Sequence, residues 1–346
     1  MRKLFLLLLM VTLLACGAVG TPSTPSTKAL APAFTLVSES PVVTHGPSGT
    51  WDGRFTDPGA VLYYDGQFHM FRNGFSQWPG RVGVAYLTSP DGKVWTAVSD
   101  GPLFDADDVP YAEFAVLASS ALVEDGQWVL YFHTWDSTSS VGPSRIGRAT
   151  APAPEGPWTV DPEPILVPRP PGAWDEFAVN APNVIKTADG YLMYYTGAQQ
   201  RAVSRQIGLA RSEDGLTWTK YDNPDSVEPP FAESDPLLVA GASRTWDEGS
   251  LFQPRVVQTE TGWLMAFRGN NFYQAHGYGL ATSRDGLAWT KYLGNPIIVP
   301  EDLPGGRGAF QSALLAHDDR YYLFSEMSKG QGTDIYLFTH EGTIWE

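Results

Sequence analysis

The chain has 346 residues, a formal net charge of −15, 43% hydrophobic residues and 13% aromatic residues, with 12 Trp, 35 Gly and 28 Pro. A surface this acidic repels phosphate backbones, so nucleic acid is excluded as an expected partner. The length permits two domains or one large all-β unit, and the abundance of Gly, Pro and aromatic residues favours many short strands joined by turns.

The N-terminal segment predicts export. Arg2 and Lys3 precede an apolar run, Leu4 to Leu14, that is too short to span a bilayer comfortably and is typical of a signal peptide. The run ends in Leu13-Leu14-Ala15-Cys16, and this ending resembles a bacterial lipobox, whose cysteine receives lipid and becomes the mature N-terminus. The alternative is an ordinary signal peptide with an unrelated cysteine. Because Cys16 is the only cysteine, no disulfide is expected.

These features divide the chain into three parts. Residues 1–16 are predicted to be a lipoprotein signal peptide, residues 17–33 a tether rich in Thr, Pro and Ser, and residues 34–346 one folded domain. We expect a monomer on the extracytoplasmic side of a bacterial membrane, anchored through a lipid on Cys16.

One unit recurs five times along residues 34–346. Each copy begins with a proline and apolar residues, and these starts are Pro41-Val42-Val43, Pro102-Leu103-Phe104, Pro164-Ile165-Leu166, Pro236-Leu237-Leu238 and Pro296-Ile297-Ile298. Three copies continue into a corner, at Trp51-Asp52, Trp174-Asp175 and Trp246-Asp247. The second copy has the degenerate Tyr111-Ala112-Glu113, and the fifth has lost the signature. A tight turn such as Asp65-Gly66 or Asp125-Gly126 then introduces an aromatic strand.

Each unit therefore predicts about four antiparallel strands, and such sheets repeated around an axis make a propeller. A linear solenoid would need polar end caps, which the sequence lacks. The predicted fold class is all-β, a five-bladed β-propeller of four-stranded antiparallel blades. The segment Phe34 to Val43 is predicted to supply a strand to the last blade and so to close the ring.

Residues 174–218 contain Trp-Asp, Pro-x-Val-Ile, Asp-Gly-Tyr-x-Met-Tyr-Tyr-Thr-Gly and Ile-Gly-Leu-Ala-x-Ser-x-Asp-Gly-x-x-Trp in that order. This pattern resembles the five-bladed propeller glycosidases, a superfamily that includes arabinanases and β-xylosidases, invertase-like and levanase-like enzymes, and β-mannoside phosphorylases. The similarity extends from about Val42 to Trp345. It implies the fold and a carbohydrate substrate or ligand, but it specifies the reaction weakly because blade motifs are scaffold.

Glycosidases generally need two carboxyl groups, one to protonate the leaving oxygen and one as base or nucleophile. A polar residue confined to one blade is a better candidate than one that recurs. Asp57 stands before a proline in the first blade, where the third and fourth blades carry Ala181 and Gln253. In the arabinanase-like and invertase-like families an Asp-Pro at this point is the base or nucleophile, and the resemblance implies that role for Asp57. The alternative is an Asp that caps a turn.

The proton donor is less well defined. Glu176 and Glu248 follow the Trp-Asp corners, and the resemblance implies an acid in the fourth blade, so Glu248 or Glu176 is the candidate. The arabinanase-like family usually carries its Glu at the strand start, where this chain has Gln253. The Asp that tunes the acid in that family is replaced by Asn180. An Asn can hydrogen-bond a sugar hydroxyl but cannot titrate.

Other polar residues are predicted to line a solvated central funnel and bind substrate, because they would be costly in an apolar core. They are Arg72, His133, Arg268 and Glu326 at the ends of aromatic strands, and Asn180, Asn183, Gln253, Arg255 and Gln311 on the preceding strands. The alternative is ion pairing between blades. Trp78, Trp135 and Phe272 lie in irregular stretches and are candidates for stacking on sugar rings.

The predicted function is a glycoside hydrolase that cleaves oligo- or polysaccharides with a carboxylate pair in the funnel. A non-catalytic surface propeller that binds glycan or protein is the alternative. A phosphorylase is a third possibility, for which Arg72, Arg255 and Arg268 would supply the phosphate site. No metal motif or cofactor loop occurs in the sequence, so no metal or cofactor is expected.

Overall fold

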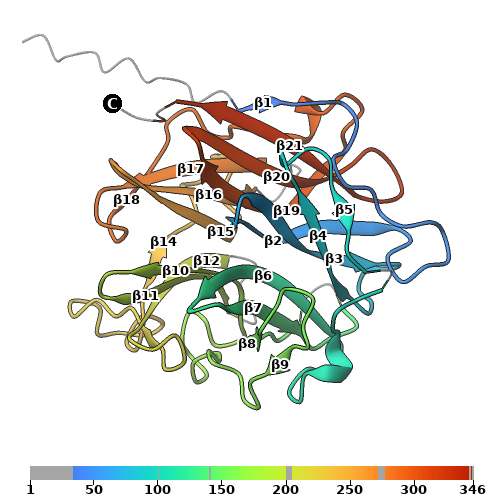
Figure 1. Cartoon of the computed structure of the whole chain (residues 1–346). Helices are drawn as coiled ribbons and strands as arrows, with labels where there is room; N and C mark the ends of the chain where they lie inside the picture. Colours follow the sequence, from blue (N-terminus) through green and yellow to red (C-terminus); the bar gives the residue numbers. More distant parts are fainter. Residues whose placement is uncertain are drawn as a thin grey trace, which may run out of the picture. The chain divides into compact units, whose positions relative to one another are not determined.

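The computed structural model describes residues 34–99, 101–139, 142–199, 205–271, 277–342 and 344. Five antiparallel sheets are arranged around a common centre (Figure 1), as the sequence predicts. The first strands of neighbouring sheets lie against one another in the cyclic order β2, β6, β10, β15, β19 and back to β2. The domain is therefore a closed five-bladed β-propeller.

Each sheet has four strands in sequence order from the centre outward, with the last sheet completed by the N-terminal strand. The first strands are β2 (Phe55–Tyr64), β6 (Ala115–Glu124), β10 (Ala178–Thr187), β15 (Ser250–Thr259) and β19 (Gly308–His317). The second strands are β3 (Gln67–Phe75), β7 (Gln127–Trp135), β11 (Gly190–Ala198), β16 (Gly262–Asn270) and β20 (Arg320–Ser328). The third strands are β4 (Gly83–Ser89), β8 (Ile146–Ala151), β12 (Arg205–Ser212), β17 (Gly277–Ser283) and β21 (Asp334–Glu341). The outer strands are β5 (Thr96–Ala97), β9 (Thr159–Val160), β13 (Thr219–Lys220), β18 (Trp289–Lys291) and β1 (Thr35–Leu36).

Three short elements lie outside this scheme: β14 (Pro236–Leu238), which pairs with β12, and the 3₁₀ turns Ala106–Asp108 and Pro300–Asp302. The pairing of β14 is one instance of a contact that every blade makes. The apolar residue that ends each proline-led segment bridges the third strand of a blade, in the pairs Val43–Ile335, Phe104–Val84, Leu166–Ile146, Leu238–Ile207 and Ile298–Tyr278. The recurring Pro-led motif thus attaches to the third strand of each sheet.

The first two strands of each blade form a hairpin with a two-residue turn. Asp65 and Gly66 both have positive φ, as do Asp125 and Gly126, which is the geometry that matches the twist of a hairpin. Every first strand also carries a β-bulge near its beginning. A bulge changes which side chains face which side of the strand, so it decides which residues point to the centre of the ring.

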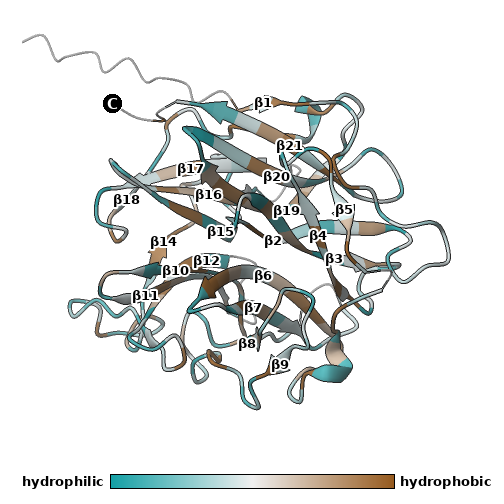
Figure 2. Ribbon diagram, in the orientation of Figure 1, coloured by the Kyte–Doolittle hydropathy of each residue, from teal (hydrophilic) through white to brown (hydrophobic). Residues whose placement is uncertain are grey.

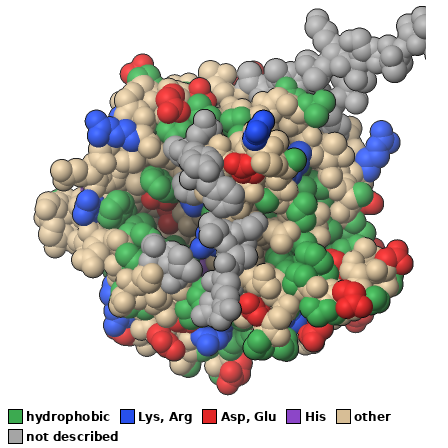
Figure 3. Space-filling view, turned by 180° about the vertical axis from the view of Figure 1, so that it is seen from behind, with side chains coloured by type: hydrophobic (Ala, Val, Ile, Leu, Met, Phe, Trp, Pro, Cys, Tyr) green, Lys and Arg blue, Asp and Glu red, His purple; other side chains and the backbone are tan. Residues whose placement is uncertain are grey.

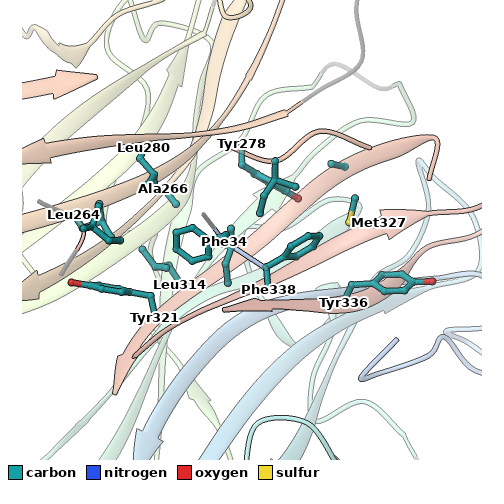
Figure 4. Packing of buried hydrophobic residues seen from close by; sticks show 14 of the residues in the cluster. Phe34, Leu264, Ala266, Tyr278, Leu280, Leu314, Tyr321, Met327, Tyr336 and Phe338 are labelled. Atoms are coloured by element: carbon teal, nitrogen blue, oxygen red, sulfur yellow. The ribbon is translucent and has the colours of Figure 1, made fainter. Parts of the chain in front are cut away.

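The ring closes as predicted. Strand β1 pairs with β21, with Thr35 opposite Thr339 and Leu36 opposite Phe338. The N-terminal end of the domain therefore supplies the outer strand of the fifth blade. Phe34 is buried in a cluster with Tyr278, Leu314 and other residues of the fourth and fifth blades (Figure 4).

The core consists of separate hydrophobic clusters between adjacent blades, and hydrophobic stretches run along the strands of every sheet (Figure 2). Because each cluster belongs to two neighbouring sheets, every blade depends on its neighbours for burial. This arrangement fixes the first strands against one another and gives the central cavity a rigid wall.

The Trp-Asp corners are structural, as their recurrence predicts. Asp52, Asp175 and Asp247 are all buried, and each accepts a hydrogen bond from a cation of its own blade. The three pairs are Arg72–Asp52, Lys220–Asp175 and Lys291–Asp247, with nitrogen–oxygen distances of 2.5 Å. Each ion pair ties the corner before a blade to the strands of that blade.

In the described part of the chain no helix has the length and apolar character that a membrane crossing requires. The predicted signal peptide, the tether and Cys16 lie outside the described residues.

Candidate active site in the central cavity

A cavity of about 420 Å³ lies where the five sheets meet. Strands of all five blades form its wall, chiefly the beginnings of the first strands and the ends of the second strands. Figure 3 shows a face of the molecule that is hollowed near its centre, with acidic and basic side chains in the hollow. The predicted central funnel is therefore present as a cavity.

One register position supplies much of this lining. The seventh residue of each second strand is, in blade order, Asn73, His133, Thr196, Arg268 and Glu326. His133, Arg268 and Glu326 contribute directly to the wall. Asn73 and Thr196 instead hold wall residues, because Asn73 donates to the Asp57 side chain and the Thr196 hydroxyl accepts from the Gln253 amide.

The prediction that Arg72 lines the funnel is wrong. Arg72 precedes Asn73 by one residue, so its side chain faces the other side of the strand. There it forms the buried ion pair with Asp52 and lies over the Trp51 ring at 5.1 Å. The alternative considered for these residues was ion pairing between blades, but Arg72 pairs with an aspartate of its own blade.

Asp57 lies in the bulge of β2 and faces the cavity. Its Oδ1 accepts hydrogen bonds from the Gly59 amide at 2.9 Å and from Asn73 Nδ2 at 2.7 Å. Its Oδ2 is buried and has no hydrogen-bond partner among the described residues. One oxygen thus orients the carboxyl group while the other has no partner in the described part of the chain, which goes beyond what a turn-capping Asp would need.

Glu326 brings a second carboxyl group to the same cavity. The Gln311 amide donates to its Oε2 at 3.1 Å, and the Thr333 hydroxyl lies 2.7 Å from its Oε1. Thr333 also accepts a hydrogen bond from the Thr56 amide next to Asp57. The two acids are therefore connected through a short stretch of scaffold between the first and fifth blades.

The two carboxyl groups titrate differently. Burial raises the pKa of Asp57 to about 6, although Asn73, the Gly59 amide and the charges of Arg255 and Arg72 oppose the increase. Burial and, after it, the negative charge of Asp57 raise the pKa of Glu326 to about 8. Near neutral pH the favoured state is an ionised Asp57 beside a protonated Glu326, which is the division of roles that acid–base catalysis requires.

The other predicted lining residues divide into two groups. His133, Asn180, Gln253, Arg268 and Gln311 line the cavity. Asn183 and Arg255 do not; they connect neighbouring first strands, because Asn183 Oδ1 accepts from the Val256 amide and Arg255 Nε donates to the Ser312 carbonyl. Burial lowers the pKa of His133 to about 3, so its imidazole is neutral at the cavity wall.

Glu176 and Glu248 are not brought to the cavity. Glu176 Oε2 accepts a hydrogen bond from the Gly172 amide, and Glu248 Oε2 accepts one from the Arg244 amide. Each carboxylate closes the turn in which it stands, four residues after its partner, and neither is part of the cavity wall. The recurrence of Glu at this corner is explained by the turn, and the candidate for the proton donor becomes Glu326.

Aromatic residues form the side of the cavity contributed by the first two blades. The Phe55 and Phe75 rings stack at 5.0 Å, and Trp78 lies 5.6 Å from Phe75 and 5.2 Å from Trp135. Trp78 is 37% exposed, so part of its ring is open to a ligand. Trp78 and Trp135 were predicted from the sequence, whereas Phe272 lies outside the described residues.

Several wall residues were missed by the sequence reasoning, among them Arg205, Ser250, Asn270 and Thr333. Counting seven residues from each two-residue turn would have found Asn73, which holds the wall residue Asp57, but no comparable signal marks Arg205. Among the described residues no cluster of His, Cys, Asp and Glu side chains could hold a metal ion.

A five-bladed propeller with a central cavity that contains two carboxyl groups is the class that the fold and the site define. No family model matches the chain. Over 65 residues it is 40% identical to Xylosidase/arabinosidase 43A of Humicola insolens, and this match spans only 19% of each chain.

Solved structures match over most of the domain. A glycosyl hydrolase from Bacteroides ovatus has a TM-score of 0.67 and 15% identity, over 89% of this chain and 93% of that chain. A second match is a structure described with the GH130 family of mannoside phosphorylases, a family that contains glycoside hydrolases that target β-1,2 mannosidic linkages in Candida mannan. It has a TM-score of 0.68 and 16% identity, over 91% of this chain and 95% of that chain. The chain therefore has the fold of the five-bladed propeller glycoside hydrolases.

Proposed function

We propose that this protein is a glycoside hydrolase that cleaves glycosidic bonds of oligo- or polysaccharides in its central cavity. The observation that carries the proposal is the pair Asp57 and Glu326, two buried carboxyl groups in one cavity whose pKa values are separated by their surroundings. The aromatic side of the cavity supports a sugar ligand, because ring faces such as that of Trp78 pack well against the apolar faces of sugars.

The chain's own groups suffice for the chemistry. Glu326, protonated near neutral pH, gives its proton to the oxygen of the leaving group as the glycosidic bond breaks. Asp57 acts through Oδ2, either by removing a proton from an attacking water or by attacking the anomeric carbon itself. Asn180, Gln253 and the neutral His133 offer hydrogen bonds that orient the sugar hydroxyls.

The proposal is tested by screening the purified protein against aryl glycosides, including arabinofuranoside, xyloside and mannoside, and against fructans. We expect release of the aryl group or reducing sugar from at least one class. Failure on every substrate, together with binding of the same sugars, would support a non-catalytic role instead.

The pH dependence follows from the two carboxyl groups. We expect kcat/KM to rise with pH as Asp57 ionises near its pKa of about 6, and to fall as Glu326 loses its proton near its pKa of about 8. In Glu326→Gln the alkaline fall should disappear, and the rate on a glycoside with a poor leaving group should drop by roughly 10²- to 10⁴-fold. On a dinitrophenyl glycoside, whose leaving group needs little protonation, the rate of Glu326→Gln should fall much less. An alkaline limb that persists in Glu326→Gln would contradict the assignment.

A glycan-binding propeller without turnover is the second candidate, and one observation favours it. Both carboxylate oxygens of Glu326 already have hydrogen-bond partners, the Gln311 amide and the Thr333 hydroxyl. A protonated Glu326 must reverse the contact with Thr333 or break it before it can reach a leaving group. Sugar binding in calorimetry with no detectable product after prolonged incubation would decide for this candidate.

We also propose, on the sequence of residues 1–33 alone, that the protein is an extracytoplasmic lipoprotein anchored through Cys16. The expected result is that the full chain sediments with membranes in a bacterial host, whereas Cys16→Ser appears in the soluble fraction. If the full chain and Cys16→Ser distribute equally between the membrane and soluble fractions, or if the mass of the full chain shows no lipid, Cys16 is not acylated.

A further inference from the structure

Two arginines converge on one side of the central cavity. Arg268 at the end of β16 lies over the Phe252 ring at 4.6 Å, and Arg205 at the start of β12 lies over the same ring at 4.9 Å. All three residues belong to the cavity wall. They stand on the third and fourth blades, whereas the aromatic residues Phe55 and Trp78 belong to the first blade.

Neither arginine forms an ion pair with an acidic side chain in the described part of the chain, although the charge of Glu326 acts on Arg268. By contrast, the buried cations Arg72 and Lys220 each contact an aspartate within 3 Å. Arg268 has a buried Nε without a hydrogen-bond partner among the described residues. The neighbouring segments 200–204 and 272–276, whose structure is not described, contain no Asp or Glu.

The two guanidinium groups are close enough to repel each other. Burial lowers the pKa of Arg268, the charges of Tyr278 and Glu326 oppose that effect, and the charge of Arg205 adds a smaller lowering. Holding two like charges in a shielded place is unfavourable unless something neutralises them. Asp57 is not available for this, because the buried Arg255 already faces its charge. At neutral pH, with Glu326 protonated, this part of the wall carries more positive than negative charge in a chain of net charge −15.

We propose that Arg205 and Arg268 bind the carboxylate of an acidic sugar, so that the cavity accepts a uronic acid unit rather than a neutral one. The inference rests on the proposed function and names its substrate class. Arg268 offers donors to a planar carboxylate, and a guanidinium group matches that geometry with two parallel hydrogen bonds. The sugar ring would then extend from the arginines towards the two carboxyl groups and the aromatic side of the cavity. Inorganic phosphate has similar oxyanion chemistry and must be distinguished by experiment.

The test measures binding, so its outcome does not depend on whether a bond is cleaved. Calorimetry with the full protein compares methyl glucuronoside and methyl galacturonoside with their methyl esters, which differ only by the loss of the charge. We expect each free acid to bind roughly 10- to 100-fold more tightly than its ester. In Arg268→Gln and Arg205→Gln this preference should disappear, and in Arg268→Lys it should persist in part. Arg284→Gln, which changes an exposed arginine on an outer turn, is the matched control and should keep the full preference.

Equal affinity for acid and ester would overturn the proposal, as would a preference that survives both glutamine variants. Tighter binding of inorganic phosphate than of either uronoside, with bond cleavage only in its presence, would assign the arginines to phosphate and also overturn it. If the uronosides bind as expected but no glycoside is ever cleaved, the substrate class stands and the hydrolytic function fails.

Discussion

Asp57→Asn is expected to abolish most of the glycosidase activity, lowering kcat/KM by roughly 10²- to 10⁴-fold, because an amide can neither take a proton from water nor attack the sugar. The substitution keeps the shape of the side chain. Its oxygen can still accept from Gly59 and Asn73, and its nitrogen replaces Oδ2 at the cavity. The measurement is kcat/KM on the best substrate of the screen, with the fold checked by circular dichroism.

Stability provides the control for this variant. The folded pKa of Asp57, about 6, is higher than the value of 3.8 expected in the unfolded chain. Ionisation is therefore less favourable in the fold, and stability decreases as the pH rises from about 4 through 6. An Asn avoids this cost, so Asp57→Asn should be at least as stable as the wild type at pH 7. Asp125→Asn, in an exposed hairpin turn, is the matched variant and should change neither property. Wild-type activity in Asp57→Asn would exclude the residue from catalysis.

The blades could be predicted from the sequence because they are built from local signals. The Asp-Gly turn, the Pro-led segment and the Trp-Asp corner each recur at similar spacing, and each specifies a contact within one blade or with its immediate neighbour. Because the corner acids Asp52, Asp175 and Asp247 recur and Asp57 does not, recurrence also distinguished structural acids from the candidate catalytic acid. The predicted closure of the ring by Phe34 to Val43 is confirmed by the pairing of β1 with β21, although no motif in that segment pointed to it.

The cavity wall was harder to predict because it depends on bulges. In the pairing of first and second strands, Asp57 corresponds to Asn180, which lies opposite Thr196, and to Phe252, which lies opposite Arg268. The prolines in the sequence had suggested Ala181 and Gln253 instead. Arg72 was misplaced for a simpler reason: it directly precedes Asn73 on β3, and adjacent residues face opposite sides of a strand.

The role of Glu326 and the position of Arg205 could not be derived from local patterns either. Glu326 was recognised as a lining residue, but its pKa depends on Asp57, which lies on another blade and is distant in sequence. Arg205 reaches the cavity from a third strand, whereas the repeats pointed only to first and second strands. The electrostatics of the site are a property of the closed ring, and only the structure shows which charges meet there.

The largest loss of stability without loss of chemistry is expected for Asp175→Asn. Asp175 is fully buried, and its Oδ2 accepts from Lys220 Nζ at 2.5 Å and from the Tyr195 hydroxyl at 3.1 Å. Burial lowers the pKa of Lys220, and the charge of Asp175 opposes that effect. Removing the carboxylate leaves Lys220 buried without a counter-charge, which typically costs about 3–5 kcal/mol. Urea unfolding should show this decrease, while activity per folded molecule stays at the wild-type level.

A second substitution separates the lost pair from general damage to the corner. In Asp175→Leu combined with Lys220→Met, both charges are replaced by apolar groups of similar size, and such replacements are often neutral or stabilising. We therefore expect the double variant to recover most of the stability that Asp175→Asn loses. If the double variant is as unstable as the single one, the corner depends on the hydrogen bond from Tyr195 and not on the ion pair. Loss of activity in a fully folded Asp175→Asn would instead contradict the division between scaffold acids and the acids of the cavity.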